Sequence, residues 1–139
     1  MKQVLVIVPF PMSNQNLAMR KQQLKSVQLS NEMEFTFRPV KAGPKNYVSE
    51  ADMVLADIAI LESGLTAENE GFDAVCIDTM SDSGVAALRS SLSIPIVGPG
   101  RASMLMALML GHQFSIITMW KKWHHLYDKT LNELGINAN

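Results

Sequence analysis

Short apolar runs alternate with helix-length segments along this sequence, and this alternation constrains the fold more than any other feature. Parallel strands that are buried on both faces appear as continuous apolar runs, whereas the connecting helices show apolar residues every three or four positions. The pattern predicts an α/β fold with an open, mostly parallel, doubly wound sheet of about five strands. The expected strands are residues 4–8, 34–38, 74–77, 94–97 and 114–118.

Helical patterns occupy the segments between these strands. Ser13 and Asn14 are suitable caps for a helix that follows the first strand. Residues 48–61 show the clearest amphipathic pattern, and Ser49 with Asp52 resembles a capping box. The side chains expected to face the core from this helix are Val48, Ala51, Leu55, Ile58 and Leu61. Further helices are expected at 102–110 and 120–134.

The composition limits the class of protein. The chain has 139 residues, a net charge of -1, 47% hydrophobic residues and a single cysteine, which suits one soluble globular domain with a substantial core. A near-neutral chain without a basic stripe is not expected to bind nucleic acid. No apolar run approaches the ~20 residues that span a bilayer, so no membrane contact is expected. A single cysteine excludes an internal disulfide and favours a reducing, cytoplasmic location.

The polar turn at residues 78–84 is the most informative candidate site. In an open parallel sheet, the turn after a strand lies at the edge where ligands usually bind. The hydroxyls of Thr79 and Ser81, with the N-terminus of the following helix, predict a bound small anion such as a carboxylate. Two alternatives stay open at this point: Thr79 and Ser81 cap that helix themselves, or Asp82 and Ser83 cap it and leave the two hydroxyls free.

Other reactive side chains near the same sheet edge have different interpretations. Asp78 ends a strand and is either a general base or a loop residue that accepts hydrogen bonds. Cys76 lies inside an apolar run and on the opposite strand face from Thr79, so we expect it to pack in the core. Thr118 and Trp120 close the last expected strand at the same sheet edge as Thr79, and they can line the same cleft.

No cofactor or metal site is predicted. The first strand is followed by P-F-P-M-S-N-Q-N and not by G-x-G-x-x-G, and there is no Walker loop. His112, His124 and His125 lack the partner spacing of a metal site, so we expect them on the surface. The G-P-G sequence at residues 98–100 lets a ligand approach the backbone closely.

Four segments carry a family resemblance: V-L-V-I-V-P-F-P-M-S-N-Q-N-L, G-F-D-A-V-C-I-D-T-M-S-D-S-G, L-S-I-P-I-V-G-P-G and F-S-I-I-T-M-W. In order and spacing they resemble the aspartate/glutamate/hydantoin racemase superfamily, nearest its hydantoin racemase branch. The resemblance implies two similar α/β lobes around a cleft, and the flavodoxin- or Rossmann-like sheet expected above corresponds to one lobe. It also implies cofactor-independent chemistry at a carbon next to a carboxyl or carbonyl group. In that family two cysteines, one from each lobe, remove and return the proton.

The sequence departs from this family pattern in ways that affect the chemistry. Thr79 stands where the resemblance places the first cysteine, and a threonine hydroxyl is too weakly acidic to replace a thiolate. The resemblance implies that residues 1–112 form one lobe, while residues 113–139 begin the second lobe and pack on the first. Family positions around the substrate match Ser13 or Asn14, Thr79, Ser81 and Thr118; the turn and its surroundings add Asp82, Ser83, Gly84 and Trp120 as expected contacts.

Three functions stay open. The first is a cofactor-independent enzyme of racemase or isomerase type that acts on a small carboxylate or hydantoin-like compound. Thr79 and Asp78 are then the catalytic candidates, and the helix after the turn stabilises a developing enolate. The second is a non-catalytic carboxylate-binding module, or a decarboxylase- or hydrolase-type relative that does not use two cysteines. The third is an α/β domain whose methionine-rich helix at 102–110 serves association. A homo-oligomer is expected because the cleft is only half covered.

Overall fold

The computed structural model describes residues 1–27 and 31–136, and its centre is an open sheet of four parallel strands in the order β2-β1-β3-β4. The register places Val4 opposite Phe35 on one side and Ala74 on the other. The predicted α/β fold with a parallel sheet is therefore confirmed. The strands are β1 (Lys2–Val8), β2 (Met33–Pro39), β3 (Ala74–Ile77) and β4 (Ile96–Val97).

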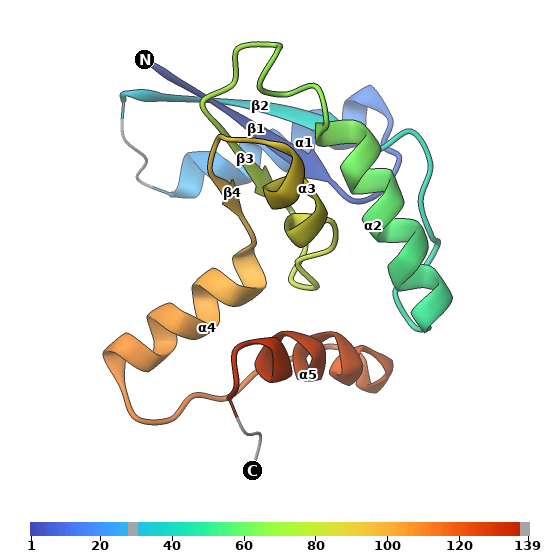
Figure 1. Cartoon of the computed structure of the whole chain (residues 1–139), viewed down its shortest axis with the longest axis vertical. Coiled ribbons are helices and arrows are strands. Elements are labelled where there is room, and N and C mark those ends of the chain that lie inside the picture. Colours follow the sequence, from blue (N-terminus) through green and yellow to red (C-terminus); the bar gives the residue numbers. More distant parts are fainter. Residues whose placement is uncertain (28–30, 137–139) are drawn as a thin grey trace.

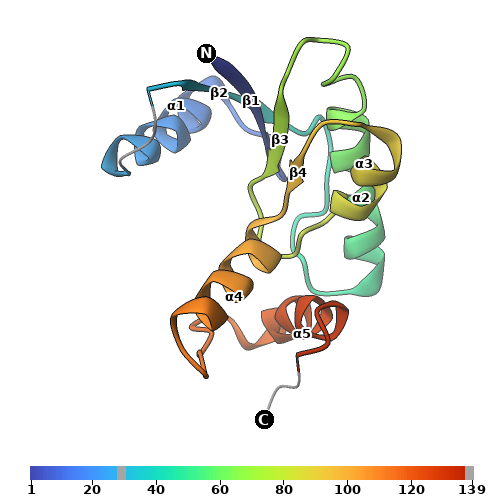
Figure 2. The ribbon, with the colours of Figure 1, turned by 60° about the vertical axis from the view of Figure 1, so that its left-hand side comes forward.

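Helices cover both faces of the sheet, as the doubly wound arrangement requires (Figures 1 and 2). On one face, α1 (Asn14–Gln22) and the short 3-10 helix η1 (Gln23–Ser26) pack on a cluster built around Val6, Val8 and Phe37. On the other face, α2 (Glu50–Gly64) and α3 (Val85–Ser91) cover the larger core cluster. Because β1 is buried on both faces, its sequence is apolar at every position from 4 to 8.

The remaining helices lie beyond the carboxyl ends of the strands (Figure 2). They are α4 (Pro99–Leu110), the 3-10 helix η2 (Lys121–Trp123) and α5 (His124–Glu133). Leu126 of α5 packs with Tyr47, Met53 and Ala56, so the C-terminal segment is held against the first part of the chain through α2. None of the described helices combines the length and the hydropathy that crossing a lipid bilayer requires.

The predicted caps at Ser13 and Ser49 are confirmed, whereas Asn14 is the first residue of α1 and not its cap. The Ser13 side chain accepts a hydrogen bond from the Asn16 backbone N–H at 3.2 Å at the start of α1. Ser49 and Asp52 form the reciprocal capping box of α2, with Asp52 N–H donating to Ser49 Oγ at 3.2 Å and Ser49 N–H donating to Asp52 Oδ2 at 3.0 Å.

The predicted fifth strand is wrong. Residues 114–118 are extended, but they form no strand, because no other segment of residues 1–27 and 31–136 pairs with them. A strand needs a neighbour to complete its ladder of hydrogen bonds, and apolar, β-branched residues alone do not supply one. The sheet consequently has four strands and not about five.

The predicted inner face of α2 is wrong in part, since Leu61 packs against the core cluster as expected but other predicted residues do not. The side chains that pack inward include Met53, Ala56 and Ile60, whereas Leu55 and Ile58 are more than half exposed. This helix is apolar nearly all round, so its sequence spacing is compatible with more than one buried face. Contact with the sheet and with α3 decides which face is buried.

Candidate functional site

The turn at residues 78–84 follows β3 directly and has a tightly constrained backbone. Asp78 N–H continues the sheet by donating to Ile7 C=O at 2.9 Å, and Asp82 then adopts a left-handed conformation with φ of 51°. Gly84 has φ of 72°, and a Cβ on it would lie 2.6 Å from Ile60 Cγ2. Glycine is therefore required where the turn passes over α2.

The three hydroxyls of the turn form a short hydrogen-bonded chain. Thr79 Oγ1 lies 3.2 Å from Ser81 Oγ, which lies 2.8 Å from Ser83 Oγ. Ser81 is 1% exposed and Ser83 is fully buried, whereas Thr79 is half-buried. Ser81 and Ser83, which we expected to contact a ligand, are therefore enclosed by the protein, and of the three residues Thr79 is the one that is partly exposed.

Asp78 is engaged in an ion pair with Arg20 of α1. Arg20 Nε donates to Asp78 Oδ2 at 2.6 Å, and Arg20 Nη2 pairs with Asp78 Oδ1. The hydrogen bonds to Asp78 raise the pKa of Arg20. Both carboxylate oxygens of Asp78 thus accept hydrogen bonds from Arg20. This geometry agrees better with a loop residue that accepts hydrogen bonds than with a free general base.

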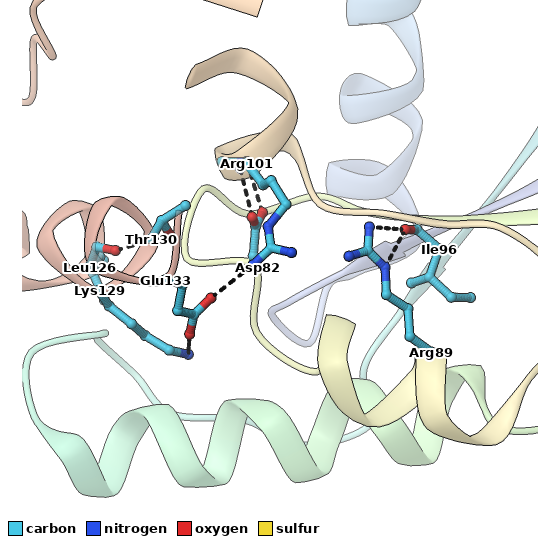
Figure 3. A network of polar contacts seen from close by, with 9 residues as sticks. Asp82, Arg89, Ile96, Arg101, Leu126, Lys129, Thr130 and Glu133 are labelled. Atoms are coloured by element: carbon cyan, nitrogen blue, oxygen red, sulfur yellow. Dashed lines mark hydrogen bonds and ion pairs between the residues drawn. The ribbon is translucent and has the colours of Figure 1, made fainter. Parts of the chain in front are cut away.

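Asp82 does not cap α3, as one alternative proposed, but caps α4 (Figure 3). Its Oδ1 accepts from Gly100 N–H at 2.8 Å and its Oδ2 accepts from Arg101 N–H at 2.7 Å. A Cβ at Gly98 or Gly100 would collide with Asp82 or with the Met80 carbonyl oxygen. The G-P-G sequence therefore permits close approach of the turn, and not of a ligand as expected.

The N-terminus of α3 is occupied by Asp57 of α2. Gly84, the N-cap of α3, donates its backbone N–H to Asp57 Oδ1 at 2.8 Å. With Asp82 at the start of α4, carboxylates of the chain itself occupy both helix starts beside the turn. Asp57 thus already places a negative charge at the α3 N-terminus, where we predicted that a small anion binds or a developing enolate is stabilised.

The other expected contacts belong to other segments of the chain. Ser13 caps α1, and Asn14 is the exposed first residue of that helix. Thr118 accepts a hydrogen bond from Tyr127 Oη at 3.3 Å, and Trp120 packs edge-on against Trp123 with ring centroids 5.6 Å apart. The predicted contacts are thus distributed over α1, the turn and the segment before α5.

Thr79 lines neither of two cavities in the structure. One, of ≈ 440 Å³, lies beside the turn, where Asp82 and Gly84 contribute to it. Arg101 Nη2 lies 3.4 Å from Glu133 Oε2 there, and Lys129 Nζ lies 3.9 Å from Glu133 Oε1 (Figure 3). Its charged side chains balance, with three cations against three carboxylates: Arg89, Arg101, Lys129, Asp57, Asp82 and Glu133. This balance does not favour an anion.

The larger cavity, of ≈ 630 Å³, was not predicted from the sequence. It lies between the end of α4, residues 112–118 and α5, and Thr118 and Tyr127 line it. His112 and His124, which we expected on the surface, also line this open cavity. Within the part of the chain that the structure describes, no group of three or more His, Cys, Asp or Glu side chains is placed to hold a metal ion.

Cys76 packs as predicted. Its half-buried side chain joins the apolar cluster around Val6, Val8 and Phe37 under α1. Burial, and then the charges of Asp78 and Asp82, raise the pKa of the Cys76 thiol. A buried thiol with a raised pKa is a weak nucleophile and a weak acid at neutral pH, so Cys76 does not replace the thiol that the family resemblance places at Thr79.

Comparisons with known proteins agree with this architecture. Residues 13–139 match the family model of the Asp/Glu/hydantoin racemases. The chain is 29% identical over 96 residues to a hydantoin racemase from Pseudomonas sp. (strain NS671), an alignment that covers 69% of this chain and 39% of that protein.

Two solved structures share the fold. The allantoin racemase from Klebsiella pneumoniae superimposes with a TM-score of 0.84 and 25% identity over 97% of this chain and 54% of its own. The allantoin racemase from Pseudomonas fluorescens superimposes with a TM-score of 0.82 and 23% identity, over 96% of this chain and 56% of its own. This chain spans about half the length of these proteins. The sequence resemblance is confirmed: the chain belongs to the Asp/Glu/hydantoin racemase family.

Proposed function

We propose that this chain supplies one side of a cofactor-independent racemase- or isomerase-type site and that Thr79 contacts the substrate there. One observation carries the proposal: in a chain of this family, the partly exposed Thr79 stands at the position where the resemblance places a cysteine. Buried Ser81 and Ser83 fix its orientation through the hydroxyl chain. Ser13, Asn14, Thr118 and Trp120 stay candidates for further contacts.

The electrostatics favour a neutral cyclic ureide over a free carboxylate as the ligand. The helix starts next to the turn already hold Asp57 and Asp82, and Asp78 is paired with Arg20. The carboxylate of a ligand would be repelled by these negatively charged side chains. A ring with amide N–H and C=O groups can instead donate hydrogen bonds to Thr79 and accept them from it. The relatives are named for hydantoin and allantoin, which both contain such a ring.

The chemistry of Thr79 limits what this side of the site does. In racemisation a base removes the proton from the carbon beside a carbonyl group, and an acid returns a proton to the opposite face. Threonine cannot act as the base near neutral pH, so it positions the ring or donates a hydrogen bond to the carbonyl oxygen as negative charge develops on it. A non-catalytic binding module is the second candidate, and the position of Cys76 on the other sheet face favours it.

Deuterium exchange tests the proposal. The chain is incubated with a 5-monosubstituted hydantoin in heavy water, and loss of the ring C–H signal is followed by NMR together with ligand line broadening. We expect Thr79→Ala to abolish broadening, while Thr36→Ala, at an exposed position of β2, has no effect. Thr79→Cys is expected to introduce or accelerate exchange. Line broadening without exchange in the parent protein and in Thr79→Cys supports the binding module. If the parent protein and Thr79→Cys show neither broadening nor exchange, both functions are contradicted.

A further inference from the structure

The hydroxyl chain of the turn has one open end. Ser83 is fully buried and Ser81 is 1% exposed, whereas Thr79 is partly exposed. Ser83 Oγ lies 2.8 Å from Ser81 Oγ, which lies 3.2 Å from Thr79 Oγ1, so three hydroxyl protons share two hydrogen bonds. Each hydroxyl has one proton to donate. One proton is therefore left without an acceptor among the three oxygens, and the direction of the chain decides which residue carries it.

Burial decides the direction of the chain. Within the described residues 1–27 and 31–136, the Ser83 hydroxyl has no hydrogen-bond partner besides Ser81 Oγ. If Thr79 donated to Ser81 and Ser81 to Ser83, the Ser83 proton would stay unpaired in a fully buried site. An unpaired buried proton disfavours that arrangement by roughly 5- to 150-fold. Ser83 therefore donates to Ser81 and Ser81 donates to Thr79, and the remaining proton is that of Thr79, at the partly exposed end.

Both acceptor positions of the Thr79 hydroxyl are engaged inside the turn. Its oxygen accepts from the Ser81 hydroxyl, and the Ser81 backbone N–H also donates to it at 3.5 Å. A hydroxyl oxygen has two lone pairs, and these two hydrogen bonds use them. Thr79 consequently keeps one hydrogen-bonding capacity, which is to donate its own proton outward.

We propose that the turn makes Thr79 a donor and not an acceptor, so that the ligand presents a carbonyl oxygen to it and not a ring N–H. This restriction rests on the proposed function, in which Thr79 contacts a cyclic ureide, and it narrows the exchange of hydrogen bonds there to one direction. Ser81 is then a positioning residue, because its side chain and backbone supply the hydrogen bonds that orient the Thr79 proton. A donor at a carbonyl oxygen stabilises the charge that develops when the neighbouring carbon loses a proton.

Hydroxyl exchange measures the direction of the chain without any ligand. The protein is labelled with ¹³C at the Cβ atoms of Ser and Thr and dissolved in mixed light and heavy water. A hydroxyl that exchanges slowly gives a doubled Cβ signal, and a hydroxyl that exchanges quickly gives a single, averaged signal. We expect doubled signals from Ser81 and Ser83 and a single signal from Thr79, whose proton faces solvent. A doubled Thr79 signal would show that this proton is donated inward, which would overturn the proposal.

Sulfur analogues of the ligand test the carbonyl contact. We titrate the protein with 5-methylhydantoin and with its 2-thio and 4-thio analogues, in which sulfur, a weaker acceptor, replaces one carbonyl oxygen. One of the two analogues should bind the parent protein more weakly than the oxygen compound by about fivefold or more. Thr79→Val should reduce this ratio to less than about twofold, and Thr79→Ser should restore it.

Ser81→Ala and Ser83→Ala form a matched pair, since each removes one buried hydroxyl from the same turn. Ser83→Ala leaves Ser81 as a donor to Thr79, so the preference for oxygen over sulfur should be unchanged. Ser81→Ala removes that donor and frees the Thr79 oxygen to accept, so the preference should fall by at least about twofold. A loss of stability common to both variants would not produce this difference in ligand preference.

Two results of the titration would overturn the proposal: no preference for oxygen depends on Thr79, or a thio analogue binds more tightly in a way that Thr79→Val removes. The second result would mean that Thr79 accepts from a ring N–H, because the N–H of a thioamide is the stronger donor. If none of the three compounds binds the parent protein, the proposed function fails, and the hydroxyl signals still decide whether Thr79 is a donor.

Discussion

Asp82 and Gly100 are joined by a 2.8 Å hydrogen bond from the Gly100 backbone N–H to Asp82 Oδ1, and this bond fastens the turn after β3 to the start of α4. The second oxygen of Asp82 accepts from Arg101 N–H at 2.7 Å. A residue expected to bind substrate thus acts within the fold, where it fixes the position of α4 relative to the turn. Thr79 lies three residues earlier and depends on the same anchored backbone.

Replacing Asp82 by Asn should destabilise the protein by about 1–2 kcal/mol, because the amide can accept only one of the two hydrogen bonds. Asn tolerates the left-handed backbone at this position, so the loss reports the cap and not backbone strain. Urea unfolding measures the difference. Asp128→Asn, at an exposed position of α5, is the control and should change the free energy of unfolding by less than ~0.5 kcal/mol. Equal stability of the two variants would contradict the capping role.

Gly100→Ala should destabilise the chain by more than ~2 kcal/mol, since the new methyl group would collide with the Met80 carbonyl oxygen. That oxygen belongs to the backbone and cannot rotate away as a side chain does. Gly111→Ala is the matched control, because its added Cβ would meet Gln113 C=O at an ordinary 3.6 Å. Thermal unfolding of the two variants should therefore differ clearly, and a similar melting temperature would show that α4 is not packed against the turn.

Local sequence chemistry predicted much of the fold but not the contacts between distant segments. The apolar run at 4–8 and the caps at Ser13 and Ser49 depend on neighbouring residues, and these predictions are confirmed. The inner face of α2 and the fifth strand depend on partners elsewhere in the chain, and the first prediction was wrong in part and the second was wrong. Asp57 and Asp82 lie 27 and 18 residues from the backbone groups they bind, so no local pattern identifies them as helix caps.

The ion pair between Arg20 and Asp78 should contribute measurably to stability because both side chains are partly buried and the contact is two-pronged. A double-mutant cycle with Arg20→Met and Asp78→Asn should give a coupling free energy of about 1–2 kcal/mol. Increasing the salt concentration should reduce this coupling only slightly. A coupling near zero would mean that α1 is held against the sheet by its apolar contacts alone.

Acid should weaken the N-terminus of α2 through Asp52. Hydrogen bonds from Val48 N–H and from the Ser49 side chain lower the pKa of Asp52 below its usual 3.8. A depressed pKa in the folded state stabilises the protein above the pKa of the unfolded chain, and the contribution is lost as the pH falls through the folded value. Asp52→Asn should therefore be less stable than the parent protein at pH 7, and the difference should shrink as the pH falls below about 3.8. A difference that is constant with pH would contradict this assignment.

Thiol reactivity should separate the two faces of the sheet. Burial raises the pKa of Cys76, so the native protein should react with Ellman's reagent at least tenfold more slowly than the urea-unfolded chain. In Cys76→Ala/Thr79→Cys, the thiol occupies the half-exposed position at the turn, away from the cluster that buries Cys76, and it should react faster than Cys76 does in the parent protein. The unfolded forms of both proteins provide the common reference rate. If the Thr79→Cys thiol is as slow as Cys76, residue 79 is not accessible to a molecule of this size, and it cannot be the residue that contacts substrate.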